Sequence, residues 1–487
     1  MRGLIGFIVV TMLSGCVLGP TFHSPKPPRM SYKTPQGTAS SAVRQGAAQT
    51  FHQSVPIPQQ WWTVFHSKPL NQLLIEAFRA NPDLKAASAA LSIAHENTAI
   101  QRAQFFPQVG GVVNPSHQLT AGTFASNLSS NAYLYTLTLA SLNISYAPDV
   151  LGLNHRRVES LEAVAEVAAF QCEAVHLTLA SHLVLAVIQE GLLQTQLQAT
   201  LRQIAIAQEQ LQLVKKQRDL GQVGADLVLS QEALYANIKG LLPPLRQQLA
   251  EQSHLIAALS GHFPNEPRPP IFTLKQLTLP QALPIRLPSE LVRQRPDIRA
   301  AEAAMHAASA AVGVALINRF PSIVLSATGG VAPVSFSPNS VPSYFSLLPT
   351  GGAWFWGFGA NVVGSIFDGG ALWHQQQAAM AAYTLSVAQY RRVVLDAFQQ
   401  VADTLKAIEA DASALKITAE GQRALQKSLA VAKKKWALGL IGYPDVLGAE
   451  QAYQQGVMVL AARQAARLND TVALFQALGG GWIPQQS

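Results

Sequence analysis

The stretch Leu438-Gly439-Leu440-Ile441-Gly442-Tyr443-Pro444-Asp445-Val446-Leu447 joins a helical pattern that starts after Gly370 to one that ends near Leu478. It therefore predicts the turn of a long helical hairpin. An earlier stretch has the same pattern at the same spacing. Its matching residues are Leu220, Gly221, Gly224, Val228, Leu229, Glu232 and Tyr235, against Leu438, Gly439, Gly442, Val446, Leu447, Glu450 and Tyr453. We therefore expect two such turns and two copies of one unit.

A shorter helical pattern supports the internal repeat. It begins with Asn81-Pro82-Asp83 in the first copy and Arg295-Pro296-Asp297 in the second, where proline suits the first turn of a helix. Each copy stops at a Phe-Pro pair, because the residue before proline is excluded from the α region. The shared positions are Pro82, Asp83, Ala86, Ala87, Ala89, Ala90, Ala94, Phe106 and Pro107, against Pro296, Asp297, Ala300, Ala301, Ala303, Ala304, Ala308, Phe320 and Pro321.

Strand-like sequence follows each stop, at 108–121 and 133–147 in the first copy and at 322–332 and 353–367 in the second. Each pair predicts a hairpin, and residues from Trp354 onward alternate between two faces with the period of a strand. Strands of about 10 residues can cross a bilayer when tilted. Because four strands leave two open edges that hydrocarbon cannot satisfy, several chains are expected to close one barrel, and three would supply twelve strands.

Long helical tracts rich in Ala, Gln and Leu follow the strands, at 154–218 and 371–436. Each has about 65 residues, which corresponds to roughly 100 Å of α-helix. Two return helices are expected at 225–259 and 445–478. The frequent alanines and few charges suit coiled-coil-like packing of these helices rather than a globular core.

The N-terminus predicts export and lipidation. Arg2 precedes an apolar run at 4–13, and Leu13-Ser14-Gly15-Cys16 resembles a bacterial lipobox. We therefore expect residues 1–15 to be a signal peptide and Cys16 to carry a covalent lipid such as palmitate, which anchors a protein without spanning the membrane. Val17, rather than an aspartate, favours sorting to the outer membrane. Residues 16–58 are rich in Pro, Ser, Gln and Gly and are expected to form a lipidated tether.

Composition excludes several classes of protein. The chain of 487 residues is 49% hydrophobic and only 13% charged, so we expect much of its surface to contact something other than water. No uninterrupted apolar run of about 20 residues follows the N-terminus, so spanning elements are expected to be β-strands. The net charge is +8, but the Lys and Arg residues are scattered, which argues against a nucleic-acid partner.

Enzyme and metal motifs are weak. Glu173-x-x-His176 and Glu251-x-x-His254 have the spacing of a di-iron bundle, but the further glutamates that such a site needs cannot be identified. We expect these residues to have surface or packing roles, and Cys172 to be a small packing residue. The Gly-rich run from Gly351 to Gly370 lacks the ending of a phosphate loop. We therefore expect neither enzyme activity nor a cofactor.

Taken in order along the chain, these motifs resemble those of the NodT-type outer-membrane efflux lipoproteins of the TolC superfamily. The shared motifs are Cys16-Val17-Leu18-Gly19-Pro20, Trp61-Trp62-x-x-Phe65, Asn81-Pro82-Asp83-Leu84, Arg295-Pro296-Asp297-Ile298-Arg299-Ala300-Ala301-Glu302, Phe320-Pro321-Ser322, Phe367-Asp368-Gly369-Gly370 and Ala477-Leu478-Gly479-Gly480-Gly481-Trp482. The resemblance implies an α+β membrane protein: a homotrimer with a twelve-stranded outer-membrane β-barrel, a twelve-helix periplasmic tunnel and an equatorial domain.

The domain boundaries follow from the repeat together with this resemblance. The first structural repeat is expected at 59–262, the equatorial linker at 263–290, the second repeat at 291–478 and a C-terminal tail at 479–487. By resemblance, the protein would be the exit duct of a tripartite pump. It would conduct small molecules, such as drugs and toxic compounds, from an inner-membrane transporter of the resistance-nodulation-division type and a periplasmic adaptor. The alternatives are a type I secretion duct for a polypeptide, or a structural envelope lipoprotein that does not conduct.

The resemblance also implies a periplasmic gate, a ring of acidic residues in an Asp-Val-Leu-Asp pattern. The sequence matches at Asp445, but Gly448 replaces the second acid. Three Asp445 carboxylates would attract cations and repel one another. The alternative role of Asp445 is a helix N-cap.

The two turns between long helices are expected to contact the adaptor through Gly221, Gly224, Gly439 and Gly442. They combine small and apolar residues where two helices end, as a tip-to-tip contact would need. The alternative is that these glycines only cap helices in the left-handed conformation.

Overall fold

The computed structural model describes residues 17–26, 49–52, 57–124, 131, 133–266, 271–284, 288–335 and 354–481. The chain divides into two compact units, which are treated separately below. Unit 1 comprises Met1–Ser24, Ser92–Glu166 and Ala303–Ala388, and unit 2 comprises Pro25–Leu91, Val167–Glu302 and Gln389–Ser487.

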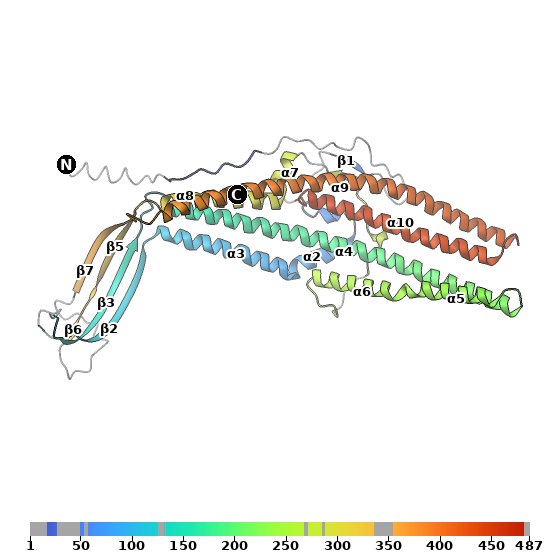
Figure 1. The fold of residues 1–487 in the computed structure, drawn as a ribbon, viewed down its shortest axis with the longest axis horizontal. Coiled ribbons are helices and arrows are strands. Elements are labelled where there is room, and N and C mark those ends of the chain that lie inside the picture. The colour runs from blue at the N-terminus through green and yellow to red at the C-terminus, as the bar shows by residue number, and fades with distance from the viewer. Residues whose placement is uncertain are drawn as a thin grey trace. The chain divides into compact units, whose positions relative to one another are not determined.

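The order of elements is similar in the two halves of the chain (Figure 1). The first half contains α2 (Lys68–Ala80), α3 (Pro82–Arg102), β2 (Gln108–Leu119), β3 (Leu134–Tyr146), α4 (Leu153–Asp219), α5 (Ala225–Gly240) and α6 (Leu242–Leu259). The second contains α7 (Pro288–Gln294), α8 (Pro296–Ile317), β5 (Ser322–Val331), β6 (Val334–Ser335), β7 (Trp354–Val363), α9 (Ala371–Ala437) and α10 (Tyr443–Ala477). Both long helices, α4 and α9, have 67 residues, so the predicted long tracts are confirmed.

The first return helix differs from the prediction because it is broken. A single helix was expected at 225–259, but α5 ends at Gly240 and α6 begins at Leu242 with proline in its first turn. Pro243 and Pro244 lack the backbone N–H that a continuous helix needs. The second return helix contains no such pair in its interior, and α10 runs unbroken for 35 residues.

Acidic and amide side chains accept hydrogen bonds from backbone N–H groups at the N-termini of three helices. Asn81 Oδ1 accepts hydrogen bonds from the backbone N–H groups of Asp83 and Leu84, so Asn81 caps α3. Asp149 accepts from the N–H groups of Asn154 and His155 at the start of α4. Asp368 accepts from Leu372 and Gly370 before α9, and these bonds lower the pKa of its carboxyl.

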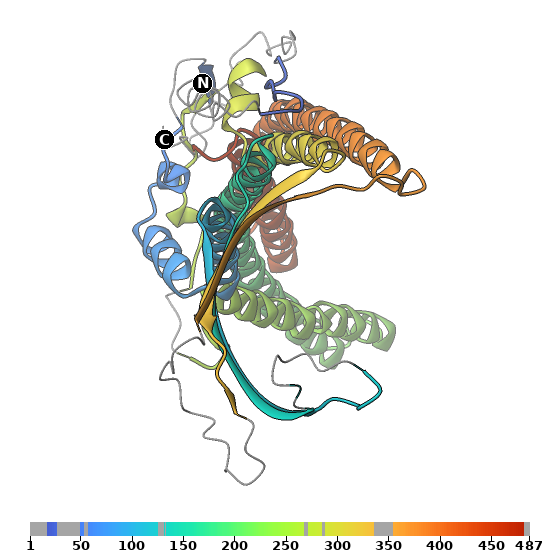
Figure 2. The same cartoon turned by 90° about the vertical axis from the view of Figure 1, so that its left-hand side faces the viewer.

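The four predicted strands form one curved antiparallel sheet in unit 1 (Figure 2). Both predicted hairpins are confirmed, because β2 pairs with β3 and β5 pairs with β7. The structure adds a pairing between β3 and β5, with Tyr146 opposite Leu325, which joins the two hairpins. The short strand β6 also pairs with β3. Among the described strands, β2 and β7 end this path, so each leaves one edge unpaired.

Large apolar side chains lie exposed on this sheet. Trp356 is 78% exposed and Phe358 81% exposed, and their rings stack with centroids 6.0 Å apart. Val109 and Val113 on β2 are also exposed. Exposed apolar side chains that gather on one element mark a surface that contacts another molecule or a membrane. The described part of the sheet has this composition.

The main hydrophobic core lies in unit 2. It packs the 3-10 helix η1 (Trp61–Phe65) and α2 against the middle of α4, against α9 and against the second half of α10. The Trp61 ring stacks on Phe475 with centroids 5.5 Å apart. The segment between the two halves joins this core, because Phe272 is buried and its N–H donates to Glu190 Oε2 over 3.1 Å.

Part of the N-terminal stretch is also fixed in this core. The strand β1 (Thr50–His52) pairs in parallel with β4 (Ala282–Pro284), and Ile57 is buried. The range 16–58, expected to be a tether, thus includes residues that pack in unit 2.

Two helices, α4 and α8, meet a length and composition test for membrane spans. The test averages hydropathy over a window, so it is less strict than the uninterrupted run sought in the sequence. Nearly half of each window is buried inside the chain, as in a packed helix.

A partly buried polar cluster links α9 and α10. The Asp411 carboxyl lies within hydrogen-bonding reach of Asp470, and Arg463 lies 3.8 Å from Asp411. Arg467 is almost fully buried and donates to the carbonyl of Ile408. Burial, followed by the charge of Asp411, raises the pKa of Asp470 to about 7.

The raised pKa makes stability depend on pH. Asp470 binds a proton more tightly in the folded chain, so its contribution to the free energy of unfolding falls as pH rises from about 4 to 7. We expect Asp470→Asn to match the wild type at pH 4 and to be more stable by about 1–2 kcal/mol at pH 8. Urea unfolding of the purified protein across this range measures the difference. Asp403→Asn, an exposed change on α9, is the control, and a pH-independent difference for Asp470→Asn would contradict the assignment.

Candidate functional site

Two helical turns lie at the same end of unit 2 (Figure 1). The α4–α5 turn spans 220–224, and the α9–α10 turn spans 438–442. Both were predicted from the repeated glycine pattern. They form the candidate site, which we call the tip.

The first halves of the two turns have the same backbone geometry. Gly221 and Gly439 both have φ of 72°, in the left-handed region that favours glycine. The Gly221 N–H donates to the Arg218 carbonyl and the Gly439 N–H donates to the Trp436 carbonyl, at 2.8 and 2.9 Å. The next residue in each turn donates to the carbonyl five residues before it. These are Schellman motifs, so both glycines end their helices as left-handed caps.

Gly224 and Gly442 have a different role. Their φ values are −77° and −76°, with extended ψ, and they are the N-cap residues of α5 and α10. The left-handed cap that was considered for all four glycines is therefore correct only for Gly221 and Gly439.

Asp445 lies in the first turn of α10, exposed to solvent. The alternative role of Asp445 as the N-cap is wrong, because α10 begins at Tyr443 and Gly442 occupies the capping position. The Asp445 carboxylate instead accepts a hydrogen bond from the Gly442 N–H over 3.1 Å, as the third helical residue does in a capping box. Its negative charge also suits the positive end of the helix macrodipole.

Gly448 lies one turn beyond Asp445 on the same side of α10, because residues three apart are neighbours on a helix surface. A β-carbon at Gly448 would meet no atom within 4 Å. The position is therefore open, and an acidic side chain would fit beside Asp445.

Three polar contacts join α10 to α4 near the tip. The Tyr443 hydroxyl donates to Glu209 Oε1 over 2.7 Å, and this bond raises the pKa of Tyr443. Arg202 pairs with Glu450 at 2.6 Å, and Gln203 donates to Gln455 over 3.4 Å. Sequence reasoning missed the tyrosine contact, because its partner is 234 residues away.

The sequence repeat contains a sign of the contact between Arg202 and Glu450, because it places a glutamate at the same position in both copies. Glu450 and Glu232 occupy matching positions in the repeated tip pattern. Each pairs with a cation of α4, Glu450 with Arg202 and Glu232 with Lys215 at 2.7 Å. Both return helices are thus tied to the same long helix by equivalent side chains.

The end of the tip is apolar and basic. Leu220, Leu438 and Leu440 are 73%, 74% and 68% exposed. Lysines lie exposed near the C-terminal ends of the two long helices: Lys216, Lys433, Lys434 and Lys435. Cations at a helix C-terminus complement the macrodipole. An exposed apolar end surrounded by positive charge is the composition of a docking surface.

The other candidate residues do not form a site in the part of the chain that the structure describes. Cys16 lies outside the described residues. The His176 ring contacts Phe78, with centroids 5.2 Å apart, which is a packing role. Among the described residues, no group of three or more His, Cys, Asp or Glu side chains could hold a metal ion.

Known proteins with similar sequences cover nearly the whole length of this chain. The model of the family described as outer membrane efflux protein matches residues 73–262 and 287–480, one match in each half of the chain. Nodulation protein T of Rhizobium leguminosarum is 24% identical over 97% of this chain and 96% of its own length. The pyoverdine export outer membrane protein OpmQ of Pseudomonas putida is 28% identical over 94% of each chain. The cation efflux system protein CusC of Escherichia coli is 26% identical over 98% of each chain.

Solved structures have the same fold. The outer-membrane channel OprN aligns with a TM-score of 0.79 and 25% identity, covering 96% of this chain and all of its own. The Campylobacter jejuni CmeC outer membrane channel aligns with a TM-score of 0.82 and 20% identity, covering 97% of this chain and 96% of its own.

Proposed function

The chain belongs to the outer membrane efflux protein family, and we propose that it forms the outer-membrane channel of a tripartite efflux pump. In this proposal it is a homotrimer. It receives small molecules, such as drugs and toxic compounds, from an inner-membrane transporter of the resistance-nodulation-division type through a periplasmic adaptor. It conducts them passively to the exterior.

The observation that carries this proposal is a sheet with exposed apolar side chains and two unpaired edges among its described strands. One chain supplies the path β2-β3-β5-β7, and β2 and β7 each lack a second neighbour among the described strands. In a membrane an open edge leaves backbone groups without hydrogen-bond partners, so such a sheet must close with copies of itself. Three copies give a barrel of twelve strands, within the range of bacterial outer-membrane barrels. Exposed Trp356 and Phe358 would then face lipid.

The helical part supplies the rest of the duct. Each chain contributes α4 and α9, with return helices that nearly match them in length when α3 and α8 are added. Three chains would thus surround a lumen with twelve helical columns, which end at the tip. In this assembly residues 59–262 and 291–478 are the repeats, 263–290 belong to the equatorial domain, and 479–487 form the tail.

Conduction is the direct test of this function. We expect the purified full-length protein to run as a trimer in native mass spectrometry and to produce discrete conductance steps in planar lipid bilayers. A trimer that never conducts, even after the tip contacts are removed by Tyr443→Phe and Arg202→Ala, would overturn the channel and favour a structural envelope lipoprotein. A monomer in detergent and in bilayers would overturn the closed barrel.

We place the periplasmic gate at Asp445. Around a three-fold axis the three carboxylates would form an acidic ring, since Asp445 is exposed in the first turn of α10. The contacts of Tyr443 with Glu209 and of Arg202 with Glu450 hold α10 against α4. Opening would separate these helices, and repulsion between the carboxylates would assist it.

The gate predicts opposite effects at two neighbouring positions. Asp445→Ala should weaken block of the channel by a trivalent cation, because the ring loses its charge. Gly448→Asp should strengthen the block, because a second carboxylate fits there without a clash. Single-channel recording with the cation added on the periplasmic side measures both.

The matched control for the gate is Asp226→Asn, which removes an exposed acid from the first turn of α5. Unchanged block in Asp445→Ala would sink the ring and leave Asp445 with only its bond to the Gly442 N–H. An equal loss of block in the control would assign the effect to the total charge of the tip.

We further propose that the adaptor docks on the tip. Gly221, Gly224, Gly439 and Gly442 shape the turns, and the exposed leucines provide the apolar contact. The surrounding lysines suit a partner whose own tip carries acidic side chains.

Docking predicts a loss of efflux without a loss of conduction. Leu220→Ser together with Leu438→Ser should reduce drug resistance to that of cells without the channel, because the apolar contact is removed, while bilayer conductance stays normal. Ile417→Ser, an exposed change on α9 outside the turn, is the control. Normal resistance in the double variant, at equal protein in the outer membrane, would count against docking at these leucines.

We also propose that Cys16 is acylated and that the protein is located in the bacterial outer membrane and extends into the periplasm. The proposal rests on the lipobox and on the signal-peptide pattern before it.

A further inference from the structure

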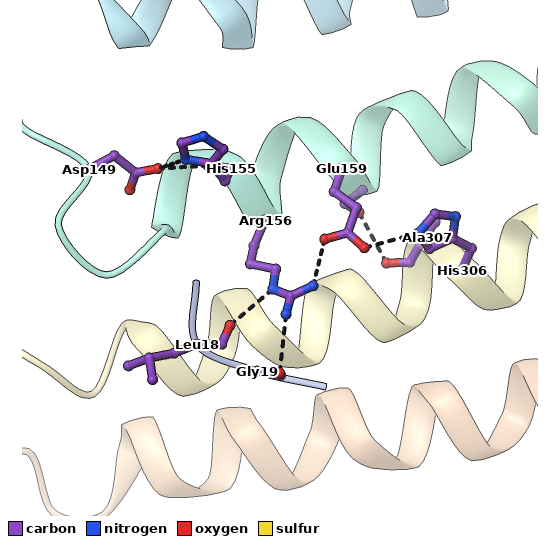
Figure 3. A network of polar contacts seen from close by, with 9 residues as sticks. Leu18, Gly19, Asp149, His155, Arg156, Glu159, His306 and Ala307 are labelled. Carbon is purple, nitrogen blue, oxygen red and sulfur yellow. Dashed lines mark hydrogen bonds and ion pairs between the residues drawn. The ribbon is translucent and has the colours of Figure 1, made fainter. Parts of the chain in front are cut away.

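The segment that follows Cys16 is held in place by a buried arginine. We call residues 17–22 the strap. The Leu18 N–H donates to the Leu151 carbonyl over 3.2 Å. Arg156 of α4 donates from Nε to the Leu18 carbonyl at 3.0 Å and from Nη2 to the Gly19 carbonyl at 3.1 Å (Figure 3). One guanidinium thus binds two consecutive backbone carbonyls of the strap.

The rest of the guanidinium is also engaged. Arg156 Nη1 donates to Glu159 Oε2 over 2.7 Å, and its side chain is only 6% exposed. The second oxygen of Glu159 accepts from His306 Nε2 at 3.0 Å. The His306 ring stacks on Phe22 with centroids 4.5 Å apart. The network therefore returns to the strap at its other end, and Figure 3 shows the polar part of this circuit between α4 and α8.

Two glycines allow the strap to approach so closely. Gly19 has φ of 110°, and a β-carbon there would lie 2.7 Å from the Gly313 Cα. A β-carbon at Gly313 would lie 3.1 Å from the Arg156 side chain. Side chains at these positions would force the strap away from α8 and the arginine.

Val17 is fixed at the junction between sheet and helix. A β-carbon at Gly152 would lie 2.9 Å from the Val17 Cα, so the two backbones touch. Gly152 stands between the end of β3 at Tyr146 and the start of α4 at Leu153. The strap therefore begins where the chain leaves the sheet.

Burying a guanidinium requires that its donors be satisfied. Here two of the acceptors are backbone carbonyls of the strap, so the arginine is satisfied only when the strap is docked. A tether that moved freely would leave the Arg156 donors without these two acceptors. These observations fix the position of residues 17–22 within the range 16–58, which was expected to form a lipidated tether.

We propose that Arg156 is a positioning residue that fixes the lipidated N-terminus at the periplasmic end of the sheet. Consecutive Cα atoms are about 3.8 Å apart, so the lipid on Cys16 has no spacer between it and Val17. The acyl chains therefore enter the membrane beside the sheet that spans it. The membrane part rests on the proposed acylation of Cys16 and on the proposed barrel, whereas the docking of the strap does not.

The mobility of a spin label tests the docking. The label is placed at Thr21→Cys, an exposed strap position, in the full-length protein with Cys172→Ala. We expect an immobilised spectrum in this background and loss of the immobilised component in Arg156→Met. Arg157→Met, an exposed neighbour on α4, is the matched control and should leave the spectrum unchanged. Arg156→Lys should restore it only in part, since lysine cannot donate to both carbonyls from a planar fork.

The outcomes distinguish a loss of strap docking from a general failure of the variant to fold. A mobile label in the unaltered background overturns the proposal whether or not any variant folds. An immobile label in Arg156→Met, in a trimer with normal conductance, also overturns it. Loss of the immobilised component while trimer and conductance persist supports a positioning role.

The lipid is tested independently. Cys16→Ala should abolish incorporation of labelled palmitate but leave the Thr21 label immobile. In proteoliposomes containing nickel-chelating lipids, the label in the acylated protein should show enhanced relaxation, because the strap lies at the headgroups. An immobile label without such relaxation would refute the membrane placement but not the docking. Absence of palmitate in the unaltered protein would refute only the acylation.

Discussion

The described sheet of unit 1 ends in two unpaired edges, and the proposal for the whole protein depends on this constraint. Backbone N–H and C=O groups at an open edge need partners, and hydrocarbon supplies none. The pairing of β3 with β5 reduces four open hairpin edges to two, at β2 and β7. Exposed aromatic side chains on the same sheet make water an unfavourable surrounding. The proposed assembly in a membrane would satisfy both requirements together.

The two turns of the tip share one backbone geometry but carry different side chains. Left-handed glycines end α4 and α9 with equal geometry, because both helices need the same reversal. The surrounding side chains differ, since Leu227 stands in the first repeat where Asp445 stands in the second. The repeated glycine pattern thus accounts for the equal backbone geometry of the two turns. Its proposed gate charge depends on the second copy alone.

Buried charge has a different role in each unit. In unit 1, Arg156 is satisfied by the strap and by Glu159, so burial specifies one position for an otherwise extended segment. In unit 2, Asp470 lies beside Asp411 with Arg467 nearby, and desolvation raises the pKa of Asp470. Both clusters tie together residues that no local pattern connects.

The sequence by itself determined the two long helices, the four main strands, their order and the two turns. These features depend on local chemistry: Phe-Pro pairs stop helices, Asn81 caps one, glycines permit positive φ, and alternation marks strands. The resemblance added the family, which the comparisons confirm. The break at Pro243 was also readable from sequence, although the prediction ran the helix through it.

Only the tertiary structure decided which distant residues meet. Three contacts join positions more than a hundred residues apart. They are the pairing of β3 with β5, the hydrogen bond from Tyr443 to Glu209, and the hydrogen bond from Arg156 to the Leu18 carbonyl. Hydrogen bonds and close backbone contacts between such positions leave no periodic trace in the chain. They arise because packing brings the elements together.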